Sequence, residues 1–261
     1  KEICDILKKG YDVVHLHTSY WKRLLIEELA VQYQVPKIIV HSHSTFVDIQ
    51  DAEARKKAEE LHFALRKKFD MSLATDFCAC SKDAADWLFG DNIPRSRIRI
   101  LRNAIDVERY LFHAQIRADM RSRLGLDGKF VIGHVGRFSY QKNHEFLVDV
   151  FHDVCKEMPH AVLMLIGEGP LEAPIHEKAA RLGLSEKILF MGQREDVPDL
   201  LQAMDMFCLP SRFEGLGIVL IEAQAAGLPC LISDIMTDEG AITDLVTRLP
   251  LEVDPWREYI L

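Results

Sequence analysis

The order of apolar and polar residues along the chain predicts helices and strands in alternation. In the first half, apolar residues at helical spacing alternate with short β-branched runs. The expected helices lie at residues 2–9, 24–33, 51–69 and 81–90, and the expected strands begin the segments 11–17, 36–44, 77–80 and 98–106. In the longest helix, apolar residues share one face, and they are Ala54, Ala58, Leu61 and Leu65. Ser81 is expected to cap the helix that follows it.

The second half contains short apolar runs, each followed by a helical pattern. These runs lie at residues 130–137, 161–169, 187–192, 206–211 and 229–234. That spacing predicts β-α-β units on a parallel sheet. Residues 110–128 are charged and resemble a linker. We therefore expect an α/β protein with two domains, at residues 1–109 and 110–261.

Composition narrows the function classes. With 261 residues and 48% hydrophobic content, the chain can form two ordinary domains with real cores. Lysine and arginine number 32 against 40 aspartate and glutamate, so the net charge of 32 − 40 = −8 argues against nucleic acid as a partner. An anionic ligand must therefore meet a local cluster of positive charge.

The six cysteines lie mostly in apolar runs, which predicts reduced, buried thiols of a cytoplasmic protein. Cys78 and Cys80 lack the second pair that a zinc site needs, so no metal site is expected there.

No segment approaches the roughly 20 continuous apolar residues of a membrane span. One cluster of basic residues suits peripheral contact with the inner face of a membrane, and it comprises Arg55, Lys56, Lys57, Arg66, Lys67 and Lys68. Interleaved glutamates favour the alternative, an ordinary solvated helix face.

Ligands of open parallel sheets bind beyond the carboxyl ends of the strands, so the loops there are candidates for chemistry. In the loop after residue 211, Glu214 and Glu222 stand eight residues apart, and Gly215 and Gly217 precede a helix expected from about Ile218. A helix N-terminus beside glycines offers backbone N–H groups to a phosphate, and a carboxylate can hold sugar hydroxyls. On spacing alone, the alternative is favoured: Glu222 is an ordinary exposed helix residue, and Glu214 is a first-turn partner of the helix dipole.

The loop after the run at 130–137 carries two cations, Arg137 and Lys142. Such a pair supplies the local positive charge that a diphosphate requires. A solvated loop with two routine charges is the alternative. The GEGP segment, Gly167 to Pro170, is by itself weak evidence for a ligand-binding loop. It supports such a loop only because it follows one of the predicted parallel strands.

Several motifs together resemble the group 1 glycosyltransferases of glycosyltransferase family 4, which are retaining enzymes of the GT-B fold. The motifs are GR-x4-KN at 136–143, IGEGP at 166–170, GQREDVPDLL at 192–201, FEGLGIVLIEAQAAGLP at 213–229, ACSKDAADWLFG at 79–90 and NAID at 103–106. With HSHS at 41–44, they look most like members from bacterial capsular and exopolysaccharide clusters. The resemblance implies two Rossmann-like domains facing a cleft, the first of them incomplete.

The resemblance also implies roles for individual residues. Arg137 and Lys142 would neutralise the donor diphosphate, Glu214 would contact the donor sugar, and His43 would face the reacting sugar from the first domain. Glu222 would bind the ribose hydroxyls. The other implied donor-binding residues are Gly136, Glu168, Gly169, Arg194, Asp196, Val197, Phe213, Gly215, Leu216 and Gly217. His41 and His17 lie nearby in pattern, but a histidine at a strand end is more often structural.

The implied reaction transfers a sugar from a nucleotide-sugar donor, with UDP as the default over GDP or ADP, to a saccharide or lipid-linked acceptor. No cofactor is expected beyond this substrate. No Asp-x-Asp motif occurs in the chain, so catalysis is expected to proceed without a metal.

Two departures from the family pattern bear on activity. The opening strand and glycine-rich loop of the family have no counterpart before residue 11, so the first domain is expected to be truncated, and Ala104 replaces a frequent glycine. A non-catalytic nucleotide-sugar-binding remnant is therefore the rival hypothesis. Another GT-B enzyme, an epimerase or a phosphorylase, ranks lower, because a phosphorylase needs a pyridoxal-phosphate lysine and a longer chain.

Overall fold

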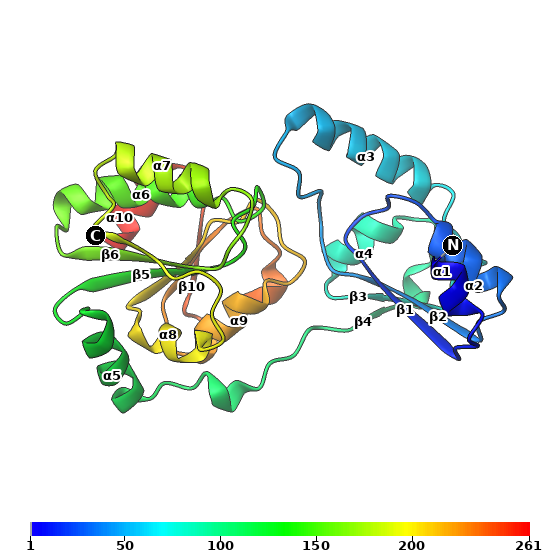
Figure 1. Ribbon diagram of the computed structural model, residues 1–261, viewed down its shortest axis with the longest axis horizontal. Coiled ribbons are helices and arrows are strands. Elements are labelled where there is room, and N and C mark those ends of the chain that lie inside the picture. The colour runs from blue at the N-terminus through cyan, green and yellow to red at the C-terminus, as the bar shows by residue number, and fades with distance from the viewer. Residues whose placement is uncertain (1) are drawn as a thin grey trace. The chain divides into compact units, whose positions relative to one another are not determined.

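Every strand pairing in residues 2–261, which this computed structural model describes, is parallel. The strands form two sheets, each in its own compact unit (Figure 1). The first unit extends to Asn103 and includes the short segment Phe213–Leu216, and the second contains Ala104–Arg212 and Gly217–Leu261. The predicted α/β fold with two parallel-sheet domains is confirmed.

The first unit has a sheet of four strands in the order β1-β2-β3-β4. Its elements are α1 (Glu2–Leu7), β1 (Val13–Thr18), α2 (Leu25–Gln32), β2 (Lys37–Ser42), α3 (Ala52–Arg66), β3 (Asp76–Ala79), α4 (Lys82–Phe89), a 3-10 turn (Arg95–Arg97) and β4 (Ile98–Ile100). The Ser81 side chain accepts a hydrogen bond from the Ala84 N–H at 3.1 Å, so the predicted cap of α4 is confirmed. Because β1 pairs with β2 in register, His17 lies opposite His41.

The core of the first unit is aromatic. Trp21, Phe69, Phe77 and Phe89 are all at most 1% exposed, and Phe69 contacts the other three rings at centroid distances of 4.5–6.0 Å. The predicted apolar face of α3 is not what this helix buries, since Leu61 is 47% exposed. The buried residue of α3 is His62 instead. The helix α3 is thus attached to the unit by the hydrogen-bonding side chain of His62, whereas the sequence pattern predicted attachment by apolar packing.

His62 is held in its neutral form by its neighbours. Its Nδ1 accepts the Trp21 backbone N–H at 3.0 Å, and its Nε2 donates to the Trp87 carbonyl at 3.0 Å. Burial is the main reason that the pKa of His62 falls from 6.5 to about 4, although the bond to the Trp87 carbonyl opposes this shift. Protonation would place an N–H on Nδ1 against the N–H of Trp21, so the folded state excludes the proton.

We expect the first unit to lose stability as the pH falls from 6.5 towards 4. The unfolded chain takes up a proton on this histidine below about 6.5, whereas the folded chain does so only near pH 4. The contribution of His62 is therefore complete above pH 6.5 and decreases by at most about 1.4 kcal/mol per pH unit below it. An NMR titration of the His62 ring checks the cause, and a midpoint near 6.5 in the folded protein would contradict it.

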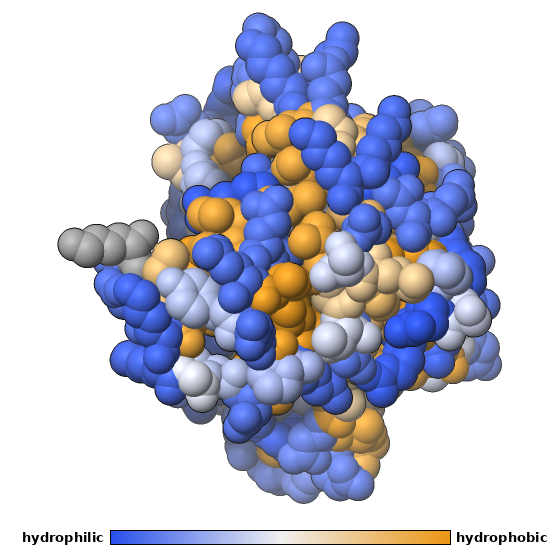
Figure 2. Space-filling view, turned by 90° about the vertical axis from the view of Figure 1, so that its right-hand side faces the viewer, coloured by the Kyte–Doolittle hydropathy of each residue, from blue (hydrophilic) through white to orange (hydrophobic). Residues whose placement is uncertain are grey.

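Figure 2 shows hydrophobic residues interspersed among hydrophilic ones on the surface. The exposed large hydrophobic residues of the first unit include Ile6 of α1, Val13 of β1 and Val31 of α2, each 42–50% exposed. β1 is an edge strand of its sheet. Among residues 2–261, none of the helices has the length and apolar composition needed to cross a bilayer.

The second unit has a sheet of six strands in the order β10-β9-β8-β5-β6-β7. Its elements are a 3-10 turn (Val107–Arg109), α5 (Ala114–Leu124), β5 (Phe130–Val135), α6 (His144–Glu157), β6 (Ala161–Ile166), α7 (Glu172–Arg181), β7 (Ile188–Phe190), α8 (Val197–Ala203), β8 (Met206–Leu209), α9 (Ile218–Ala225), β9 (Cys230–Ser233), a 3-10 turn (Asp238–Gly240), β10 (Val246–Leu249) and α10 (Val253–Ile260). Numbered from β5, this is the doubly wound order of dinucleotide-binding folds, and its switch point lies between β5 and β8.

Helices cover both faces of this sheet (Figure 1). One core lies beneath α5, α8 and α9 and includes Met120, Leu200 and Leu220; the other lies beneath α6, α7 and α10 and includes Phe151 and Trp256. Since both faces are buried, β6 reads as six consecutive buried apolar residues. The five predicted strands are confirmed, whereas β10 was missed because all four of its residues are only half-buried.

The expected linker at residues 110–128 is wrong. Most of it is α5, which packs against α8 and belongs to the second unit. Two of the charged residues that suggested a linker attach α5 to the sheet. Arg117 and Arg121 both form ion pairs with Asp205, which directly precedes β8. The boundary between the units falls after Asn103 and not after residue 109.

Candidate donor-binding site

The loops that follow β5, β6 and β7 are joined by backbone hydrogen bonds. Gly136 N–H donates to the Ile166 carbonyl at 2.9 Å, and Gly167 N–H donates to the Gly192 carbonyl at 2.9 Å. A Cβ on Gly167, which has φ +133°, would lie 2.3 Å from the Gly136 carbonyl oxygen. A Cβ on Gly169 would lie 2.4 Å from the carbonyl oxygen of Phe138. The glycines of the GEGP motif are therefore required for these loops to approach one another.

A pocket of about 440 Å³ lies at the carboxyl ends of β5, β6 and β7. It is lined by Val135, Gly136, Arg137, Ile166, Gly167, Glu168, Gln193, Arg194 and Val197. Of the residues predicted for donor binding, Gly136, Arg137, Glu168, Arg194 and Val197 meet here. The sequence prediction did not include Gln193, whose backbone N–H points to Oε1 of Glu168 at 3.5 Å.

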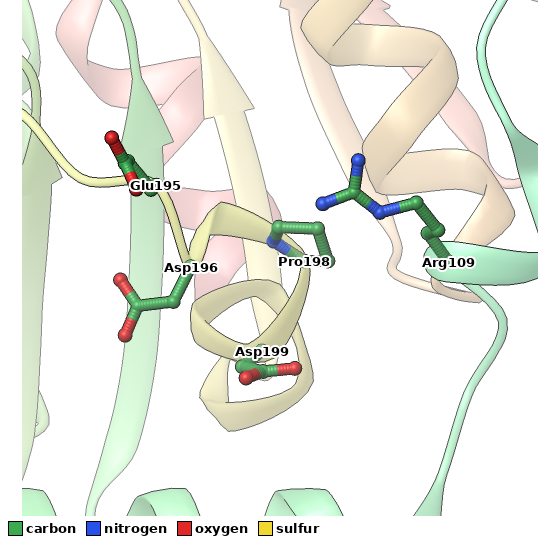
Figure 3. A pocket seen from close by; sticks show the side chains of 5 residues that line it. All are labelled: Arg109, Glu195, Asp196, Pro198 and Asp199. Atoms are coloured by element: carbon green, nitrogen blue, oxygen red, sulfur yellow. The ribbon is translucent and has the colours of Figure 1, made fainter.

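Asp196 does not line this pocket. Arg194 donates two hydrogen bonds to its carboxylate, at 2.8 and 2.7 Å, and these bonds lower the pKa of Asp196. Asp196 instead lines a neighbouring pocket of about 390 Å³, with Arg109, Glu195, Pro198 and Asp199. Figure 3 shows the Arg109 guanidinium directed towards Pro198 and the Asp196 carboxylate directed away from Arg109. Asp196 therefore orients and partly neutralises Arg194 rather than facing the main pocket.

Lys142 lies beside the pocket. A Cβ on Gly136 would lie 3.0 Å from Cδ of Lys142, so the lysine stem packs along this glycine. The next residue, Asn143, has left-handed φ of +56°, a conformation that asparagine tolerates better than most residues. Its Oδ1 accepts a 2.7 Å hydrogen bond from Arg212, which joins the loop after β5 to the loop after β8. The KN motif thus fixes the backbone conformation that places Lys142.

Glu222 lies on α9, one turn after its N-terminus at Ile218. Its Oε1 accepts a 2.8 Å hydrogen bond from the Tyr110 hydroxyl. Burial, followed by the Glu222 carboxylate, raises the pKa of Tyr110 to about 12, so this hydroxyl keeps its proton. Nothing in the sequence connects the two residues, because 112 positions separate them. Tyr110 orients the carboxylate predicted to hold the ribose.

We expect the substitution Tyr110→Phe to weaken nucleotide binding about fivefold. The phenylalanine keeps the ring but removes the hydrogen bond that orients Glu222, which is worth about 1 kcal/mol. Calorimetric titration with UDP measures the change. Tyr259→Phe is the matched control, since its hydroxyl accepts from Thr247 on an exposed surface of the same unit. Equal affinities of Tyr110→Phe and the native chain would show that Glu222 needs no such support.

The segment Phe213–Leu216 belongs to the first unit. There the Glu214 carbonyl accepts a 3.0 Å hydrogen bond from the Thr45 hydroxyl, and a Cβ on Gly215 would lie 2.2 Å from the His43 carbonyl oxygen. Glu214 is 6% exposed. The structure therefore brings together His43, Glu214 and Gly215, which the sequence predicted for the same site.

Gly217 precedes α9 with left-handed φ of +71°, and α9 begins at the predicted Ile218. The Phe213 ring contacts the Phe46 ring at a centroid distance of 5.4 Å with the two planes tilted by 54°, and Leu216 is buried. Phe213 and Leu216 are therefore packing residues that flank Glu214 in the sequence. The roles predicted for the individual side chains stay predictions.

Family models match both units. The model for glycosyl transferases group 1 matches residues 116–257, more than half of the chain, and the model for glycosyltransferase family 4 matches residues 4–109. The chain belongs to the group 1 glycosyltransferases.

Among solved structures, this group 1 chain is similar to Anabaena HepE in complex with UDP and glucose. The TM-score is 0.79 and the sequence identity is 22%, and the match covers 99% of the chain and 70% of HepE. It is also similar to WaaG, with a TM-score of 0.72 and 18% identity over 98% of the chain and 83% of WaaG. Both likenesses support the GT-B fold.

Curated relatives share more sequence with this group 1 chain. EpsF of Bacillus subtilis (strain 168), which is named as a glycosyltransferase, is 35% identical over 256 residues, or 96% of the chain. The Escherichia coli UDP-Gal:alpha-D-GlcNAc-diphosphoundecaprenol alpha-1,3-galactosyltransferase is 27% identical over 87% of the chain. The chain spans 65% of the length of EpsF and 59% of the length of the galactosyltransferase.

Proposed function

We propose that this chain carries the catalytic body of a glycosyltransferase that moves a hexose from a UDP-sugar to a saccharide or lipid-linked acceptor with retention of configuration. The observation that carries the proposal is the pocket at the carboxyl ends of β5–β7, where Arg137 and Arg194 lie with Lys142 alongside. In a chain of net charge −8, this cluster is the local positive charge that a diphosphate requires. The HepE complex with UDP and the UDP-Gal specificity in the name of the Escherichia coli relative favour a uridine nucleotide.

The proposed chemistry follows from where charge develops. When the bond between the sugar C1 and the phosphate oxygen breaks, its electron pair leaves with the diphosphate, and fixed cations stabilise that charge. The acceptor oxygen forms its bond to C1 on the same face, and its proton passes to the departing phosphate oxygen. His43 and Glu214 would contact the reacting sugar, and Glu222 would hold the ribose. No metal takes part in this proposal.

A role in polysaccharide assembly fits the same relatives. The name of the Escherichia coli enzyme specifies a diphosphoundecaprenol-linked acceptor, which is a lipid-linked saccharide. By analogy with that relative, the proposed transfer takes place at the cytoplasmic face of a membrane that holds the acceptor lipid, and the protein would contact that membrane at its surface. The charged face of α3 offers basic residues for that contact, although acidic residues are interleaved with them.

Calorimetric titration with UDP, GDP and ADP tests the donor site. We expect UDP to bind the native chain, and both Arg137→Ala and Glu222→Ala to weaken it. A second measurement, release of sugar from the matching UDP-sugar with and without a polyprenyl-diphosphate saccharide, tests transfer. Binding without turnover would favour a non-catalytic nucleotide-sugar-binding remnant. Failure of all three nucleotides to bind would overturn the donor-site assignment.

A further inference from the structure

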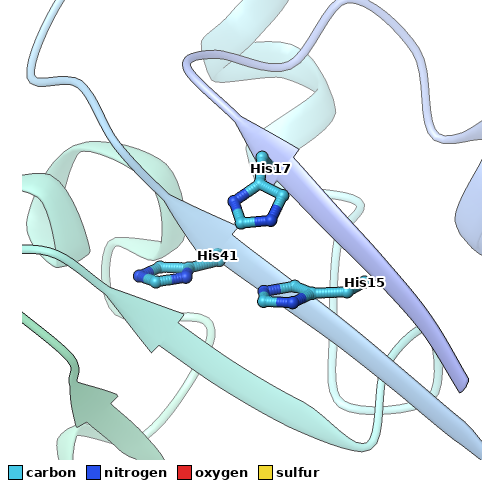
Figure 4. Close-up of side chains that lie close together, drawn as sticks. All are labelled: His15, His17 and His41. Carbon is cyan, nitrogen blue, oxygen red and sulfur yellow. The ribbon is translucent and has the colours of Figure 1, made fainter. Parts of the chain in front are cut away.

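Histidines gather on one face of the first unit's sheet. His15 and His17 lie on β1, two residues apart and therefore on the same face, and His41 lies on β2 opposite His17. Figure 4 shows the three rings directed towards one another above the two strands. The His15 and His41 rings are nearly parallel, with an interplanar angle of 2° and centroids 5.6 Å apart.

The spacing of the ring nitrogens suits a single metal ion. One nitrogen from each of the three histidines lies within 4.8 Å of the others. A tetrahedral ion with metal–nitrogen bonds of about 2.0–2.1 Å requires ligand nitrogens about 3.3 Å apart. Two of the histidines, His15 and His17, are exposed and can turn about their side-chain bonds to close that gap. Neither strand has to move.

His41 is the fixed member of the cluster. It is 7% exposed, and among residues 2–261 no hydrogen-bond partner serves its Nε2. The His41 ring has a backbone hydrogen-bond partner at Leu101. Metal-binding histidines typically use one nitrogen for a backbone or carboxylate partner and leave the other for the ion. The unsatisfied Nε2 is a buried polar atom that a metal would satisfy.

We propose that His15, His17 and His41 bind one divalent transition-metal ion of the zinc class, with water in the open position. Imidazole ligands favour zinc, copper, nickel and cobalt over magnesium, calcium or manganese. Three histidines from two adjacent strands leave the ion accessible from solvent at His15 and His17. This site does not depend on the proposed sugar transfer, which uses no metal.

The site lies next to a residue proposed for transfer. Nδ1 of His17 is 2.7 Å from Nε2 of His43, and the His41 and His43 ring centroids are 4.1 Å apart. A bound ion would place two positive charges beside the histidine that faces the reacting sugar. Because that sugar becomes positively charged in the transition state, we expect zinc bound here to inhibit transfer.

Cobalt is the direct probe, because tetrahedral cobalt absorbs visible light and zinc does not. We expect the 261-residue chain, prepared without a polyhistidine tag, to bind one Co²⁺ with visible absorption bands that Zn²⁺ abolishes. His15→Ala should weaken Co²⁺ binding at least tenfold, since it removes a ligand, and loss of an outer partner alone costs 10–100-fold. His160→Ala is the matched control, because His160 is exposed and lies in the second unit.

The outcomes are decisive in either direction. Exposed His15 can be replaced without disturbing the core, and circular dichroism confirms that the variant is folded. His17→Ala provides a second exposed ligand with the same expectation. Absence of the cobalt bands in the native chain, or equal affinity of His15→Ala and the native chain, would overturn the site.

Discussion

Replacing Lys142 with alanine is expected to lower the turnover number for sugar transfer by two to three orders of magnitude. The lysine stem packs along Gly136, which lines the pocket, and the neighbouring Asn143 fixes the loop through its bond to Arg212. In the proposed reaction, a cation held in this way would meet the negative charge that develops on the leaving diphosphate. Removal of one preorganised partner of that kind costs about 10²–10³ in rate. Steady-state kinetics with a UDP-sugar measures the loss.

Matched lysine variants separate this effect from a general loss of charge. Lys129 is exposed and precedes β5, so it lies at the opposite end of the strand that Lys142 follows. Lys129→Ala should retain full turnover, and Lys142→Arg should restore part of it, because the charge returns with a different geometry. A Lys142→Ala enzyme within threefold of the native rate would exclude the lysine from leaving-group stabilisation.

The strands of the second unit could be predicted because both faces of its sheet are buried. β6 has no polar residue to obscure it, and β5, β8 and β9 are nearly as apolar. In contrast, α5 could not be recognised as part of the fold. Two of its arginines pair with Asp205, and no local sequence pattern distinguishes a partly buried ion pair from a solvated one. The helix was therefore mistaken for a linker.

The candidate site was predictable to the extent that it follows from strand ends. Arg137, Glu168 and Arg194 each follow a parallel strand, and loops at that edge of a sheet meet. Tyr110 could not be found, because its contact with Glu222 depends on how the chain enters the second unit. The histidine site depends on the register of β1 and β2, since a shift of one residue would place His41 on the opposite face from His17.

Replacing Asp205 with alanine is expected to destabilise the second unit by about 3 kcal/mol. Its carboxylate, 20% exposed, pairs with Arg117, accepts a 3.0 Å hydrogen bond from Arg121, and accepts the Val131 N–H of β5 at 2.8 Å. Alanine would leave both guanidinium groups without this anion, and the backbone N–H without an acceptor. Loss of one partner from a fully buried ion pair costs about 3–5 kcal/mol, and the partial exposure of these side chains places the expected loss at the lower end of that range.

Fluorine NMR of fluorotryptophan-labelled protein during urea unfolding isolates this effect. Trp256 is the buried tryptophan of the second unit, whereas Trp21 and Trp87 belong to the first. The Trp256 transition should move to lower urea in Asp205→Ala, and the other two should not. Asp153→Ala is the control, because its pairs with His152 and Lys156 are more exposed and worth less than about 1 kcal/mol. An unchanged Trp256 transition would mean that α5 is held by its apolar contacts alone, with Met120 and its neighbours sufficient to fix the helix on the sheet.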